Sequence, residues 1–133
     1  MIFPLRLIFL ILIMVSMPLT ARGLDSAPPA DPSRFVLFIH AGGAASESDR
    51  KLVNTIAISL AKRGYVVRAP DDERDDVGGP GIDYFSETER PTAEDIANTV
   101  NSVSAELKGS VKVEPRRQSG KNPPGYIGVW LFK

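Results

Sequence analysis

The order of strand-like and helix-like segments is the sequence feature that most constrains the fold of this chain. Short apolar runs rich in β-branched and aromatic residues predict strands, whereas apolar residues spaced three or four apart predict helices. One helix is predicted to start at Ser46, with Asp49 completing a capping box, and a second at Thr92, with Asp95 in the same pattern. Strands are predicted at residues 34–40, 65–69, 82–85, 111–114 and 126–132. This order is typical of an α+β protein.

The same order predicts how the elements pack. It runs βαββαββ, or βαββαβ if residues 111–114 only extend a neighbouring segment. We expect a two-layer sandwich in which two helices cover one face of a mainly antiparallel sheet. In the last strand, Val129 and Leu131 share one face, and Trp130 and Phe132 share the other. Both faces are apolar, so alternation alone does not decide which of them is buried in the core. One face of this strand should be core, and we expect Trp130 to pack there.

The first 23 residues have the pattern of a secretory signal peptide. Arg6 precedes the apolar residues 7–19, and Ala21 and Gly23 place small side chains before a cleavage site. The expected location of the folded part is therefore extracytoplasmic, either periplasmic or secreted. The alternative is an uncleaved anchor formed by residues 1–20, and it is the only contact with a membrane that the sequence predicts.

Residues 24–33 carry three prolines and small side chains, which predicts a flexible linker, and residues 34–133 have the length of a single α/β domain. The whole chain holds 16 basic and 16 acidic residues. Because Arg6 and Arg22 leave with the leader, the mature chain is slightly acidic, which argues against a nucleic-acid partner. The chain has no cysteine, so packing rather than disulfide bonds must stabilise it.

The segment FVLFIHAGG, residues 35–43, resembles the start of an α/β-hydrolase, with His40, Gly42 and Gly43 matching its oxyanion motif. The chain has no Gly-x-Ser-x-Gly nucleophile elbow, and its one histidine is already used in that motif. The hydrolase interpretation is therefore rejected. We expect His40 to make a local hydrogen bond at the end of a strand, and we predict no catalytic residue and no enzymatic activity.

The acidic segment DDERDD, residues 71–76, does not fit a calcium-binding EF-hand. Asp76 falls where that loop needs glycine, and Ile82 falls where it needs a bidentate glutamate. A solvated run of charge is the expectation. His40 has no second histidine, cysteine or carboxylate motif near it in sequence, so neither a metal site nor a cofactor is predicted.

A basic loop offers the best candidate for binding. Arg116, Arg117 and Lys121 follow the predicted fourth strand, and arginine forks suit anionic groups such as those of cell-wall polymers. The first alternative is a small envelope enzyme of hydrolase type that uses carboxylates such as Asp83 and Glu87. The second is a structural module that pairs its sheet edge with another protein. Exposed aromatic side chains would instead indicate a surface on which sugars stack.

The mature chain resembles the C-terminal accessory domain of LytR-CpsA-Psr cell-wall proteins and related envelope domains. The resemblance lies in the strand-and-turn FVLFIHAGG, the helix ending AKRGYVV, the Tyr84-Phe85 strand, the second apolar-faced helix and the final strand YIGVWLF. The phosphotransferase domain of that family is absent, and no functional residue carries over. The resemblance implies an exported, non-catalytic accessory or binding domain at the bacterial cell envelope, with an envelope protein or an anionic cell-wall polymer as its partner.

Overall fold

The computed structural model describes residues 30–74 and 78–133. The predicted leader and most of the predicted linker lie outside these residues, but the end of the linker forms a short 3-10 helix, η2 (Pro32–Arg34), capped by Asp31. Within the described residues, no helix has both the length and the apolar character needed to cross a membrane.

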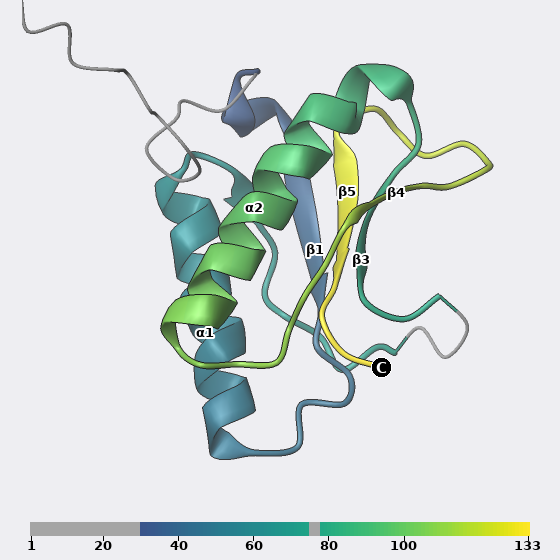
Figure 1. The fold of residues 1–133 in the computed structure, drawn as a ribbon. Coiled ribbons are helices and arrows are strands. Elements are labelled where there is room, and N and C mark those ends of the chain that lie inside the picture. Colours follow the sequence, from purple (N-terminus) through teal and green to yellow (C-terminus); the bar gives the residue numbers. More distant parts are fainter. Residues whose placement is uncertain (1–29, 75–77) are drawn as a thin grey trace, which may run out of the picture.

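A five-stranded mixed sheet and two long helices form the fold (Figure 1). The sheet order is β2-β1-β5-β3-β4, so the last strand in sequence lies in the centre. The α+β class is confirmed. The elements follow one another as β1 (Val36–His40), α1 (Glu47–Lys62), β2 (Val66–Val67), β3 (Gly81–Tyr84), η3 (Glu87–Glu89), α2 (Arg90–Glu106), β4 (Pro115–Arg117) and β5 (Tyr126–Trp130).

The predicted mainly antiparallel sheet is wrong. β1 is parallel to both β2 and β5, β3 is parallel to β4, and only the β3–β5 pair is antiparallel. The physical reason is that each long helix serves as a crossover between two neighbouring strands, β1 to β2 and β3 to β4, and a crossover returns the chain in the same direction. The two strand–helix–strand units run in opposite directions and meet at β5.

The fourth strand lies later in the chain than predicted. Val111 and Val113 are buried, as their alternation predicts, but the side chain of Asn101 bonds both the N–H and the carbonyl of Val113, at 2.8 and 2.9 Å. Those backbone groups are therefore unavailable to a strand ladder. Pairing with β3 begins instead at Pro115, within the segment predicted as a basic loop.

The first helix begins as predicted and the second does not. Ser46 and Asp49 form the expected capping box of α1. The corresponding box for the second helix is Ser86 with Glu89, ahead of Pro91 in the first turn of α2. Thr92 lies buried inside the helix. Proline is favoured in the first turn, where its missing N–H costs nothing, so the helix starts earlier than the predicted cap.

Asp95, which is therefore free of a capping role, connects the two helices. Its carboxylate accepts hydrogen bonds from Arg63 at the end of α1, at 2.5 and 3.1 Å, and from the Tyr65 hydroxyl at 2.6 Å. The Arg63 and Asp95 side chains are each only 11% exposed. Burial raises the pKa of Tyr65, and the hydrogen bond to Asp95 raises it further.

One core joins both helices to one face of the sheet. Figure 1 shows α1 and α2 on the same side of the strands. Alternation along β1 and β5 buries Leu37, Ile39, Ile127 and Val129 completely against the helices. Trp130 points to the opposite face and is partly exposed, so the expectation that it packs in the core is wrong.

Candidate functional site

The face of the sheet turned away from the helices carries a row of aromatic side chains. Because β1 and β5 are adjacent and parallel, alternation brings Phe38 and His40 beside Tyr126 and Trp130. The rings of Phe38 and Tyr126 stack with centroids 5.4 Å apart, and those of His40 and Trp130 stack at 3.8 Å. All four are partly exposed, and we call them the aromatic strip.

A shallow cavity of about 210 Å³ opens on the aromatic strip. Gly128 forms part of its floor, because a Cβ there would lie 3.1 Å from Nε1 of Trp130 and 3.6 Å from Cβ of Asp83. The absent side chain therefore leaves the space over which the indole lies. Besides the strip and Gly128, the cavity is lined by Asp83, Phe85, Asn122 and Ile127.

A larger cavity of about 670 Å³ adjoins the first and shares Phe85 and Asn122 with it. Arg34 and Lys121 add basic side chains to its lining. Glu89, also in the lining, is 8% exposed and accepts hydrogen bonds from three backbone N–H groups, those of residues 85, 86 and 125. Two connected depressions, one aromatic and one with basic side chains, therefore lie along this side of the molecule.

The three basic residues predicted to bind a ligand are not brought together. Arg116 donates to Asp83 at 2.6 Å and to the carbonyls of Gly78 and Gly79. Arg117, the next residue of β4, points to the other face and pairs with Glu87 at 2.9 Å. Lys121, in contrast, is exposed on the larger cavity.

The two carboxylates considered for an enzyme are also held by arginines. Asp83 is 9% exposed and accepts from Arg116 and from Gln118. Glu87 accepts from Arg90 at 3.0 Å and from Arg117, and the Arg90 hydrogen bond holds the pKa of Glu87 below its usual range. Each carboxylate therefore serves a separate ion-pair network.

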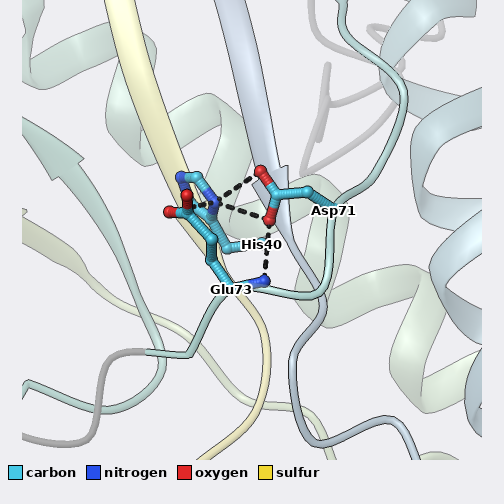
Figure 2. A group of neighbouring side chains, drawn as sticks. All are labelled: His40, Asp71 and Glu73. Carbon is cyan, nitrogen blue, oxygen red and sulfur yellow. Dashed lines mark hydrogen bonds and ion pairs between the residues drawn. The ribbon is translucent and has the colours of Figure 1, made fainter.

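One end of the aromatic strip leads into a histidine–carboxylate cluster (Figure 2). Nδ1 of His40 lies 3.0 and 3.1 Å from the two carboxylate oxygens of Asp71 and 3.6 Å from Oε2 of Glu73. The ligand atoms of the three residues all lie within 4.8 Å of one another, so these side chains could hold a metal ion. The His40 side chain is 12% exposed, whereas Asp71 and Glu73 are 45% and 69% exposed.

Parallel pairing explains why the cluster forms. His40 ends β1, and Asp71 follows β2, so both lie at the carboxyl edge of neighbouring parallel strands. The backbone continues the pairing, since the N–H of Ala41 donates to Asp71 and the N–H of Gly42 donates to Glu73. The sequence interpretation missed the cluster because His40 and residues 71–76 were each judged by their own neighbours in sequence. A strand–helix–strand unit with polar residues after both strands was the available signal.

Gly42, assigned to the rejected oxyanion motif, has a packing role. A Cβ at this position would overlap Cγ of Arg74 and the carbonyl oxygen of Glu73. The glycine is therefore needed where the two loops meet.

Comparison of the chain with protein-family models, with curated proteins and with solved structures finds no match.

Proposed function

We propose that the chain is an extracytoplasmic, non-catalytic binding domain that holds an anionic cell-wall glycan on the side of the sheet bearing the aromatic strip. The proposal includes the two-layer sandwich, with both helices on one face, because that arrangement leaves the other face open to a ligand. It also includes a relationship to the C-terminal accessory domains of LytR-CpsA-Psr proteins, on the pattern of elements alone. The observation that carries the proposal is the aromatic strip itself.

The strip has the chemistry that sugar rings require. Aromatic faces pack against the C–H faces of pyranose rings, while phenol and indole edges offer polar groups to the hydroxyls. Phe38, Tyr126 and Trp130 are partly exposed on a concave surface, and Asn122 adds an amide at its border. A mostly apolar depression with a few polar groups is typical of a ligand site.

The adjoining cavity accounts for the anionic character of the proposed ligand. Arg34 and Lys121 are exposed and line the cavity that shares Phe85 and Asn122 with the aromatic depression. A linear polymer stacked on the strip can therefore extend toward basic side chains. In this proposal Lys121 is the member of the predicted basic loop that contacts ligand, whereas Arg116 and Arg117 support the surface through their ion pairs.

Retention on purified, insoluble peptidoglycan tests the proposal. We expect Trp130→Ala and Tyr126→Ala each to weaken retention about tenfold, or roughly 1.4 kcal/mol. Ile58→Ala is the matched control, because Ile58 is a 55% exposed apolar side chain on α1 and its loss should leave retention unchanged. Retention that survives both aromatic substitutions would rule out this face.

A second measurement separates the electrostatic part. Lys121→Gln should weaken retention, and added salt should weaken the wild-type interaction more than that of the variant. Equal retention at low and high salt would remove the anionic element of the proposal. Turnover of a cell-wall or ester substrate that is lost in His40→Ala would overturn the non-catalytic assignment.

The proposed location is tested by the mass of the native protein. A mature chain that begins near Leu24 should be recovered from outside the cytoplasm. A full-length product found only in the cytosol would refute the location and, with it, a cell-wall ligand.

A further inference from the structure

We propose that His40, Asp71 and Glu73 form a binding site for a divalent transition-metal ion of the zinc type. The site lies at the carboxyl edge of β1 and β2, at one end of the aromatic strip (Figure 2). His40 belongs to both the aromatic strip and the metal cluster, but the two proposals can fail separately: Trp130 and Tyr126 variants test the glycan on the strip, whereas titration with zinc ions tests the cluster.

The distances between the ligand atoms fit the proposed ion. Zinc lies about 2.0–2.2 Å from nitrogen and carboxylate ligands, so neighbouring ligand atoms in a tetrahedral site are about 3.3 Å apart. Nδ1 of His40 lies 3.0 Å from Oδ1 of Asp71 and 3.6 Å from Oε2 of Glu73, on either side of that value. The ligand atoms of all three residues lie within 4.8 Å of one another, and the Asp71 and Glu73 side chains are 45% and 69% exposed, so rotation of these carboxylates toward an ion is not blocked by burial.

The ligand types select among metals. One imidazole nitrogen with two carboxylates suits zinc and its neighbours among the transition metals, whereas calcium and magnesium prefer sites made of oxygen ligands alone. Three protein ligands leave the fourth tetrahedral position of zinc to water or to an incoming ligand.

The structure also orients the ligands in advance. The His40 ring is stacked on Trp130 and largely buried, which fixes the direction of Nδ1. The N–H of Glu73 donates to Oδ1 of Asp71 at 3.0 Å and so positions that carboxylate. Partners of this kind, which hold a ligand without touching the metal, commonly change metal affinity about 10–100-fold. Arg74, which follows Glu73 in the chain, directs Nη2 to the Lys133 carbonyl at 2.7 Å.

Calorimetric titration of the protein with zinc ions near neutral pH tests the site. We expect saturable binding of one ion, with magnesium giving no binding in the same concentration range. Trp130 supplies a second readout, because it is the only tryptophan of the chain and is stacked on His40. Its fluorescence should change over the same concentration range as the heat.

Three variants make the test specific. His40→Phe keeps an aromatic ring against Trp130 but removes the nitrogen, and Glu73→Gln removes the charge of an exposed side chain that the fold does not need. Each should weaken zinc affinity at least about tenfold, whereas Glu106→Gln, at the exposed end of α2, should leave it unchanged. Circular dichroism of the same samples verifies folding. Absence of saturable binding, or wild-type affinity in either His40→Phe or Glu73→Gln, would overturn the proposal.

Discussion

Removing the Tyr65 hydroxyl should destabilise the domain by about 2 kcal/mol, because that group donates to an ionised carboxylate and hydrogen bonds to charged groups contribute about 1.5–3 kcal/mol. The bond to Asp95 is 2.6 Å long, and Tyr65 is 4% exposed, so water does not replace it in Tyr65→Phe. Asp95→Asn should cost more, about 3 kcal/mol, because Arg63 also loses its carboxylate partner in a largely buried site.

Urea unfolding of the purified protein, followed by circular dichroism, measures both losses. Tyr126→Phe is the matched control: it removes the same atom from a partly exposed residue whose hydroxyl makes no hydrogen bond within the described part of the chain, and its effect should stay within about 0.5 kcal/mol. If Tyr65→Phe lowers the free energy of unfolding no more than Tyr126→Phe does, the bridge through Asp95 does not stabilise the packing of α1 on α2.

Three further results are expected. Leu60→Ala should cost about 2–5 kcal/mol because Leu60 is completely buried, whereas Lys62→Ala on the exposed side of α1 should stay within about 0.5 kcal/mol in the same urea titration. The pKa of Tyr65 is raised in the folded state, so its neutral form stabilises the fold below the ordinary pKa of about 10. The free energy of unfolding should therefore fall as the pH rises above that value. If the free energy of unfolding of Tyr65→Phe falls with pH as much as that of the wild type, this reasoning is contradicted. Gly128→Ala should displace the Trp130 indole, shift its fluorescence and weaken peptidoglycan retention, at a stability cost of about 1 kcal/mol; unchanged fluorescence would show that the indole does not lie over Gly128.

The local elements of this fold are predictable from sequence and their pairing is not. The apolar stripe and the Ser46–Asp49 capping box define α1 because both signals act within one or two helical turns. Strand partners are decided over much longer distances, so the same elements were assigned to a mainly antiparallel sheet. The alternation at Val111 and Val113 correctly predicted burial, but nothing local could indicate that Asn101 would occupy the backbone of Val113.

The candidate site was less predictable for the same reason. The residue types were visible: exposed aromatic side chains indicate a surface on which sugars stack, and His40 is predicted to make a local hydrogen bond at a strand end. Its partner, Asp71, comes instead from the end of the neighbouring parallel strand. Which face of the last strand is buried depends on where the helices pack, and that is a property of the assembled sheet.

The central position of β5 has a consequence for the biogenesis of the domain. In the part of the chain that the structure describes, β5 alone joins the β1–α1–β2 unit to the β3–α2–β4 unit within the sheet, and it follows the other four strands in sequence. Until it leaves the ribosome, Val36 lacks its partner Tyr126, and closing so long a loop is slow compared with local folding. The sheet therefore cannot be completed during synthesis until β5 is available. A stop codon or deletion that removes only the last strand should leave two separate half-sheets with exposed inner edges, and such a product is a substrate for proteases and chaperones rather than a shortened but functional domain.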